Sequence, residues 1–155
     1  MKKSITPILS DTYLALIRNS VGSKLFRNFF CLIGDKKKDI LRNGDLSCAM
    51  YVSSILLLVK LIPQIHTTVN GTINAMKEAG WKTVQKPKPG SIIVWEANQF
   101  GSESHRHIGF YLGQHKAISN NSRKGYPAIH HWTFGQKQGR PNRKVEAIYW
   151  NKKLG

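Results

Sequence analysis

The sequence predicts an α+β fold in which N-terminal helices pack on a C-terminal antiparallel β-sheet. Before position 80, apolar residues recur at the three- and four-residue spacing of amphipathic helices. After Trp81, short apolar runs are separated by Gly, Pro and Asn, as in strands. Helices followed by strands in this order are typical of α+β proteins. With 155 residues, we expect a single domain over residues 1–155, with the helices of residues 1–34 as an extension.

The helical half contains three patterns. Residues 13–30 suggest one or two amphipathic helices, and the polar residues 34–38 that follow suggest a solvated turn. The nearly all-apolar residues 45–62 predict a helix that is buried on most sides and ends before Pro63. Residues 67–79 predict a third helix.

The second half predicts four strands, over residues 91–95, 107–112, 116–119 and 145–150. Alternation along the second strand puts Ile108, Phe110 and Leu112 on one face, where we expect them to join the core. His107 then lies on the other face. Gly109 beside it leaves room for a substrate or another chain.

The charge of the protein is strongly positive. There are 24 Lys and Arg residues against 8 Asp and Glu, which gives a net charge of +16. Such a surface attracts polyanions: nucleic acid, anionic lipid or an acidic cell-wall polymer. The two cysteines, Cys31 and Cys48, are too few for a disulfide scaffold, and a single bridge or two free thiols both fit the sequence.

The sequence predicts neither a cleaved secretory signal nor a membrane span. Lys2 and Lys3 resemble the start of a signal peptide, but Asp11 and Arg18 interrupt the apolar run that would have to follow. The apolar residues 55–62 are too few to cross a bilayer. We therefore expect a soluble protein and leave its location open.

Cys48 is the candidate nucleophile. Asp45 is suited to cap a helix, which would place Cys48 at the third helical position. There the helix dipole and the free backbone N–H groups favour a thiolate and lower the pKa of the thiol. The same N–H groups can stabilise an oxyanion. The alternative is that Cys48 is a small buried hydrophobic residue at a helix start.

Three ordered segments resemble the NlpC/P60 and CHAP families, which are papain-like amidases and endopeptidases of bacterial cell-wall peptides. Residues 45–48 read Asp-Leu-Ser-Cys, residues 87–95 read Pro-Lys-Pro-Gly-Ser-Ile-Ile-Val-Trp, and residues 107–113 read His-Ile-Gly-Phe-Tyr-Leu-Gly. The resemblance implies Cys48 as the nucleophile and His107 as its base, without a cofactor. The candidate substrate contacts within these motifs are Asp45, Ser47 and Trp95.

The resemblance also implies a third, polar residue on the strand after His107. Residue-for-residue counting gives Ser119, whereas a two-residue turn after Gly113 would pair Gly109 with Asn120. We favour Asn120 because an amide oxygen accepts the imidazole N–H, as in a Cys-His-Asn arrangement. Ser119 is the alternative.

These features predict a monomeric hydrolase of peptidoglycan peptides whose basic surface holds it on an anionic wall. A zinc site is not expected, because no Cys-x-x-Cys or His-Glu-x-x-His spacing occurs. An inactive or acyl-transferring protein of the same fold is an alternative. A second is a nucleic-acid-binding module, which would use aromatic residues among the basic residues of the C-terminal third. The basic residues of that set are Arg123, Lys124, Lys137, Arg140, Arg143, Lys144, Lys152 and Lys153.

Overall fold

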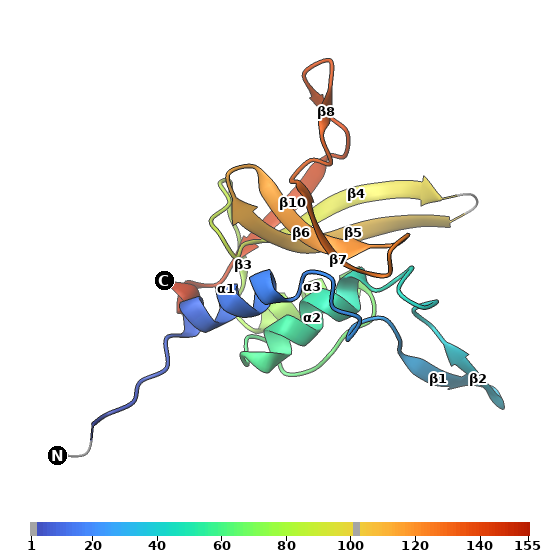
Figure 1. Cartoon of the computed structure of the whole chain (residues 1–155), viewed down its shortest axis with the longest axis horizontal. Coiled ribbons are helices and arrows are strands. Elements are labelled where there is room, and N and C mark those ends of the chain that lie inside the picture. The colour runs from blue at the N-terminus through green and yellow to red at the C-terminus, as the bar shows by residue number, and fades with distance from the viewer. Residues whose placement is uncertain (1–2, 101–102) are drawn as a thin grey trace.

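A computed structural model describes residues 3–100 and 103–155 and has the expected α+β architecture, with helices on one face of an antiparallel sheet (Figure 1). The helices are α1 (Leu9–Asn19), α2 (Cys48–Leu58), α3 (Val69–Glu78) and the short 3-10 helix η1 (Lys152–Leu154). The six-stranded sheet has the order β3-β10-β4-β5-β6-β7. Its strands are β3 (Lys82–Thr83), β4 (Ile92–Phe100), β5 (Glu103–Gly113), β6 (Lys116–Asn121), β7 (Tyr126–His131) and β10 (Val145–Trp150).

The main core lies between the helices and the sheet. Ile108 and Phe110 of β5 are fully buried there, which confirms their predicted face, and Leu112 is half-buried. Tyr13 of α1 packs edge-on against the Phe110 ring at 6.0 Å. The segment that we expected to be an extension therefore contributes to the same core as α2 and the sheet.

The opposite face of the sheet carries a smaller cluster. Ile93, Trp95 and Ala117 are fully buried there, and Trp132 and Phe134 partly cover them. The C-terminal segment thus shields the face that carries His107. This cover makes the environment of the histidine apolar.

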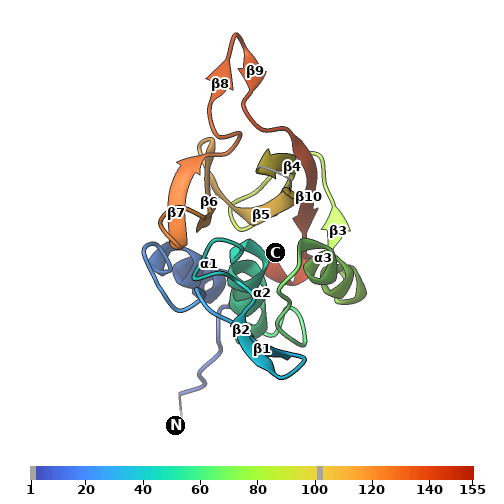
Figure 2. The same cartoon turned by 90° about the vertical axis from the view of Figure 1, so that its right-hand side faces the viewer.

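Two β-hairpins project from opposite ends of the molecule (Figure 2). One joins β1 (Phe30–Ile33) to β2 (Lys36–Asp39), and the other joins β8 (Gln136–Lys137) to β9 (Arg140–Pro141). The second amphipathic helix near Phe30, one of the two possibilities that the sequence left open, is therefore not formed by these residues. The solvated turn predicted over residues 34–38 is present but shorter, because only Gly34 and Asp35 form it and the lysines belong to β2. Gly34 has a φ of 60°, which suits the first central position of a two-residue hairpin turn and lets the lysines pair with the apolar residues as a strand.

Helix α2 is shorter than predicted. It ends at Leu58 rather than at Pro63, because Lys60 takes a φ of 57° that a helix does not tolerate. Within residues 3–100 and 103–155, no helix combines the length and apolarity that a bilayer crossing requires. Of the lysines considered as part of a signal sequence, Lys2 lies outside the described residues.

Candidate functional site

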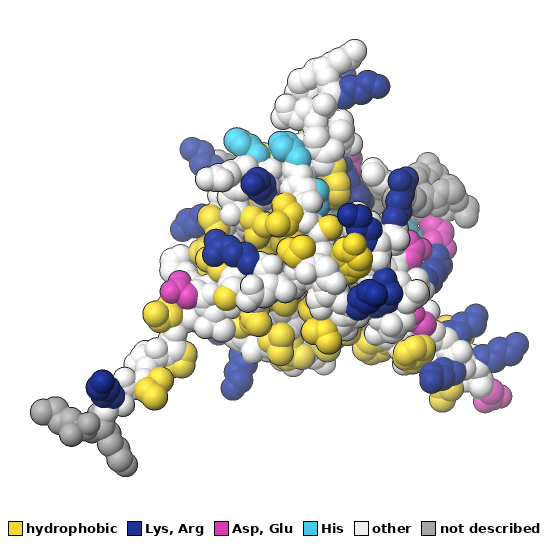
Figure 3. All heavy atoms as spheres, viewed as in Figure 1, with side chains coloured by type: hydrophobic (Ala, Val, Ile, Leu, Met, Phe, Trp, Pro, Cys, Tyr) yellow, Lys and Arg dark blue, Asp and Glu magenta, His cyan; other side chains and the backbone are white. Residues whose placement is uncertain are grey.

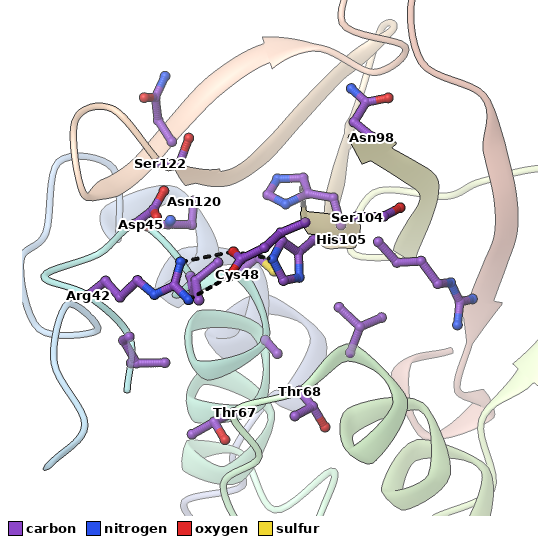
Figure 4. Close-up of a pocket in the computed structure, with 18 of the residues that line it drawn as sticks. Arg42, Asp45, Cys48, Thr67, Thr68, Asn98, Ser104, His105, Asn120 and Ser122 are labelled. Carbon is purple, nitrogen blue, oxygen red and sulfur yellow. Dashed lines mark hydrogen bonds and ion pairs between the residues drawn. The ribbon is translucent and has the colours of Figure 1, made fainter. Parts of the chain in front are cut away.

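A cavity of about 1000 Å³ opens between the N-terminal end of α2, the start of β5 and the end of β6. Figure 4 shows Cys48 at that end of α2, with Asp45 and Asn120 to one side and His105 to the other. The lining residues that concern the candidate chemistry are Arg42, Asp45, Cys48, His105, His107, Asn120, Arg123, Phe134 and Arg143. The predicted nucleophile and base therefore line the same cavity.

Cys48 is the first residue of α2, not the third. The N-cap is Ser47, whose side chain donates to the Arg27 carbonyl at 3.4 Å instead of capping the helix. Asp45 lies in the preceding turn, where the N–H of Leu46 returns to the carbonyl of Leu41 at 3.1 Å. The prediction that Asp45 caps the helix is therefore wrong, because the chain is still turning at that point.

The surroundings of the Cys48 thiol favour its neutral form. Burial raises the pKa of the thiol, while the backbone N–H groups of Ile108 and Ala49 and the charge of Arg143 partly oppose that rise. The helix start predicted a lowered pKa, and this expectation is wrong because desolvation of the thiol outweighs the groups that favour the thiolate. The N–H of Ile108 also places the sulfur next to the residue that follows His107.

A chain of hydrogen bonds determines the tautomer of His107. The carbonyl of His131 can only accept, so His130 Nδ1 donates to it at 2.8 Å and its Nε2 carries the lone pair. The Ser119 hydroxyl therefore donates to His130 Nε2 at 2.8 Å and accepts from His107 Nε2 at 2.8 Å. Nδ1 of neutral His107 is then the unprotonated nitrogen, which is the form that can take a proton from Cys48.

Both histidines of this hydrogen-bond chain are held in the neutral form. Burial, with smaller effects from Arg143 and His130, lowers the pKa of His107 to about 3. Burial also lowers the pKa of His130. The rings pack on Trp95, with centroids 5.5 Å and 5.6 Å away, and His130 stacks on Phe134 at 4.0 Å.

The partner of His107 is Ser119, so the choice of Asn120 as the third residue is not supported. The two-residue turn after Gly113 is present, since Gly113 pairs with Lys116. A β-bulge then shifts the register before Tyr111 pairs with Ala117, and Gly109 faces Ser119 rather than Asn120. One extra residue on β5 therefore reverses the face on which each residue of β6 lies.

Gly109 makes this arrangement possible. A Cβ atom there would lie 2.7 Å from the Cβ of Ser119 and 3.1 Å from the ring of Trp95. The room that the sequence predicted beside His107 is thus filled by the neighbouring strands. This packing brings Ser119 to the His107 ring.

Asn120 has a different place in the site. It is buried, and its Nδ2 donates to the carbonyl of Gly44 at 2.7 Å, which ties β6 to the loop before α2. Its Oδ1 accepts no hydrogen bond from any residue that the structure describes. Asn120 lines the cavity, but this oxygen is itself buried, so it remains an acceptor without a partner in the described residues.

The other predicted substrate contacts separate into two groups. Asp45 is exposed on the cavity wall. Ser47 and Trp95 are fully buried and are not among the lining residues, so the prediction that they contact substrate does not fit. Trp95 instead lies beneath His107 and donates from Nε1 to the Trp132 carbonyl at 2.7 Å.

Arg143, which the sequence suggested only for nucleic-acid binding, is a functional candidate in the cysteine site. Only 8% of it is exposed, and its guanidinium donates to the carbonyls of Glu96 at 2.9 Å and His105 at 3.0 Å. Its charge favours the thiolate form of Cys48. In the sequence Arg143 is one cation in a basic stretch, so no local signal separates it from its exposed neighbours.

The sequence contains a partial indication that His130 belongs to the site. Because adjacent residues of a strand point to opposite faces, the sequence allows at most one of His130 and His131 to reach the cleft face. His130 is that residue. The β6–β7 pairing, which the sequence did not predict, brings it to Ser119.

The rim of the cavity is polar. Arg42 forms two hydrogen bonds of 2.9 Å with Glu103, and His105 contacts the same carboxylate at 3.1 Å. Among the described residues, no three His, Cys, Asp or Glu side chains form a group that could hold a metal ion. Cys31 and Cys48 are both free thiols.

One of the basic residues proposed for nucleic-acid binding does not lie on a free surface. Arg143 is buried in the cavity wall and lies over the Phe134 ring at 5.7 Å. Trp150 donates to the Gly155 carbonyl, and the ammonium group of Lys88 lies 5.1 Å from the centroid of its ring.

The chain matches no protein-family model, and it matches no curated protein.

Proposed function

We propose that this protein is a papain-like cysteine hydrolase that cleaves amide bonds in bacterial cell-wall peptides. The observation that carries the proposal is the hydrogen-bond chain from the His131 carbonyl through His130 and Ser119 to His107. It leaves Nδ1 of His107 as the base in the cavity that also contains Cys48. The cell-wall substrate rests on the resemblance of the three sequence motifs.

Each step has a residue to perform it. His107 Nδ1 takes the thiol proton as the Cys48 sulfur attacks the amide carbonyl, and the C–N bond breaks as the imidazolium returns that proton to the leaving amine. Water then attacks the thioester and gives a proton to His107, and the sulfur leaves and is protonated again. The N–H groups at the start of α2 face the developing oxyanion, and Arg143 offsets its charge.

The neutral resting pair has a consequence for this mechanism. Because burial raises the pKa of Cys48 and lowers that of His107 to about 3, the proton stays on sulfur until a substrate is bound. Proton transfer then accompanies attack on the carbonyl instead of preceding it. This protects the thiol from unselective alkylation.

The direct test uses purified peptidoglycan peptides and mass spectrometry of the products. Cys48→Ala should abolish the appearance of new amino termini, and Cys31→Ser should leave it unchanged because Cys31 lies on β1, away from the cavity. Brief acid quenching of the wild type should trap a covalent acyl group on the peptide that contains Cys48. Cleavage by Cys48→Ala at the wild-type rate would refute the proposal.

A second measurement separates hydrolysis from acyl transfer. With an amine acceptor added, a hydrolase continues to give the free acid as its main product, whereas a transferase gives the new amide. We expect the free acid.

A further inference from the structure

The β1–β2 hairpin exposes large apolar side chains that the rest of the described chain leaves mostly uncovered. The exposed fractions are 59% for Phe30, 74% for Leu32 and 54% for Ile33. Leu25, in the segment that leads to the hairpin, is 83% exposed. Clusters of this kind on a protein surface mark a contact with a partner or a membrane.

Lysines lie directly across from these apolar residues. The register pairs Leu32 with Lys37 and Ile33 with Lys36. The ammonium group of Lys37 lies 4.8 Å from the centroid of the Phe30 ring. Figure 3 shows hydrophobic and basic side chains side by side on this hairpin. One strand therefore supplies apolar contacts and the other supplies positive charge.

This combination favours a lipid surface over a folded partner. A stable interface between two proteins takes roughly 20–30 residues from each side, whereas the paired strands of the hairpin are only Phe30–Ile33 and Lys36–Asp39. Docking of a second copy through so short an element would bury too little area. A bilayer surface needs no matching shape, because its acyl region accepts the apolar residues while lysine stems extend to the phosphates.

We propose that the β1–β2 hairpin docks this protein on a bilayer that contains anionic lipid. Phe30 and Leu32 share one face of the hairpin with Lys37; the two apolar residues enter the boundary between headgroups and acyl chains, and Lys37 contacts lipid phosphates. Ile33, Lys36 and Lys38 lie on the other face, where the two lysines add to the attraction by the anionic surface. Asp35 at the tip of the turn carries negative charge, so the hairpin lies along the surface rather than inserting tip first.

The base of the hairpin is tied to the cavity. Asp39 accepts hydrogen bonds from the backbone N–H groups of Phe29, Leu41 and Asn43 at 2.8–3.1 Å. Leu41 belongs to the cavity wall. Docking of the hairpin thus fixes the orientation of the cavity relative to the bilayer and keeps the enzyme beside a substrate in the envelope.

The test is flotation of the full-length protein with vesicles of phosphatidylcholine, alone or mixed with phosphatidylglycerol. We expect binding to the mixed vesicles only. Lys36, Lys37 and Lys38 all changed to Gln should weaken it on the order of a hundredfold. Leu32→Asp combined with Ile33→Asp should weaken it about tenfold or more.

Matched controls distinguish vesicle binding by the hairpin from nonspecific binding by apolar or basic residues elsewhere on the surface. Leu58→Asp alters a side chain that is 65% exposed on α2, and Lys77, Lys152 and Lys153 changed to Gln remove the same charge elsewhere. We expect both controls to bind like the wild type and all variants to keep the wild-type circular dichroism spectrum. The proposal fails if the wild type ignores anionic vesicles, or if the controls lose as much binding as the hairpin variants.

One further outcome would identify a different occupant. A dimer in sedimentation that the hairpin variants abolish, without vesicle binding, would assign the hairpin to a second copy of the chain. Flotation is measured without a peptide substrate, so it succeeds or fails independently of cleavage. Cys48→Ala should bind vesicles like the wild type even though it is inactive.

Discussion

At the scale of single residues, the candidate site depends on which side of each imidazole carries the proton. A neutral histidine has one donor and one acceptor nitrogen, and its neighbours decide which is which. The His131 carbonyl makes this decision for His130, and Ser119 transmits it to His107. A side chain two hydrogen bonds away from the base therefore influences its basic nitrogen.

The role of this hydrogen-bond chain can be tested by a substitution that interrupts it at His130. His130→Phe keeps an aromatic ring against Trp95 and Phe134 but cannot accept from Ser119, whose hydroxyl is then free to donate to His107 Nε2. That change favours the wrong tautomer, so we expect kcat to fall about tenfold or more with little change in KM. Steady-state kinetics on a soluble peptide measures both constants.

Two controls belong to that experiment. His115→Gln alters an exposed histidine that takes no part in the hydrogen-bond chain and should leave kcat unchanged. Ser119→Ala combined with His130→Phe should cost little more than the worse single change, because both break the same chain. Additive losses would argue against a shared role.

Alkylation tests the neutral state of the Cys48 thiol. Because burial raises its pKa, the rate of reaction with iodoacetamide should be low near neutral pH and should rise steadily above pH 9, without a plateau in acid. Mass spectrometry of labelled peptides follows Cys48 and Cys31 in the same sample. Rapid labelling of Cys48 at mildly acidic pH would show instead that a thiolate–imidazolium pair already exists.

At the scale of elements, patterns of apolar residues predicted most helices and strands. They did not predict how neighbouring strands pair, and therefore on which face each strand residue lies. Strand β10 (Val145–Trp150) was predicted with its observed bounds, and β5 has its predicted core face. The bulge in β5 was not predictable, because no residue type marks an extra residue in a strand. That single insertion selected Ser119 over Asn120.

The hairpin shows a second limit of local patterns. Residues of the Phe30–Ile33 strand fit a helical spacing when they are read together with the preceding apolar residues. Their exposure could not be deduced from sequence either, since a run of large apolar residues normally predicts burial. Only the absence of covering elements in the described fold reveals them as surface.

We predict that Asp39 holds the base of this hairpin in place. Partial desolvation opposes ionisation, but hydrogen bonds from Phe29, Asn43, Asn28 and Leu41 lower the pKa of Asp39 to about 2. Asp39→Ala should therefore speed hydrogen exchange at the backbone amides of Phe29, Leu41 and Asn43. Asp35→Ala at the turn is the matched control and should leave those rates unchanged. Unchanged rates in Asp39→Ala would mean that the strand pairing alone holds the base.

At the scale of the whole molecule, buried neutral histidines couple folding to pH. The pKa of His107 falls from its ordinary value of 6.5 to about 3, and that of His130 is also lowered. As pH falls, the unfolded chain binds these protons first, so stability present above about pH 6.5 is lost toward pH 3. We expect Tm to decrease between pH 7 and pH 5, and less steeply in His107→Gln. Calorimetry across this range checks the slope, and a Tm that is constant or rises on acidification would contradict it.

The net charge of +16 acts over the whole surface and predicts a salt effect. If the basic surface holds the protein on an anionic wall, added salt should release it from isolated cell walls. Cleavage of a short uncharged peptide should not change over the same salt range, because the catalytic groups are shielded in the cavity. Pelleting of the protein with cell walls at increasing salt measures the first effect. Equal retention at low and high salt would exclude electrostatic adhesion.

The sequence by itself determined the α+β class and the strong positive charge, because these follow from local periodicity and from composition. It also suggested the candidate thiol and base, through the resemblance of three motifs. The tertiary structure decided which residues contact the candidate thiol and base and which side chains are buried. It made Ser119 the partner of His107, brought His130 and Arg143 to the site, moved Ser47 and Trp95 into the interior, and left Phe30 and Leu32 uncovered. Each of these outcomes depends on strand register or on packing between segments far apart in the chain, and neither leaves a mark on the local pattern of residues.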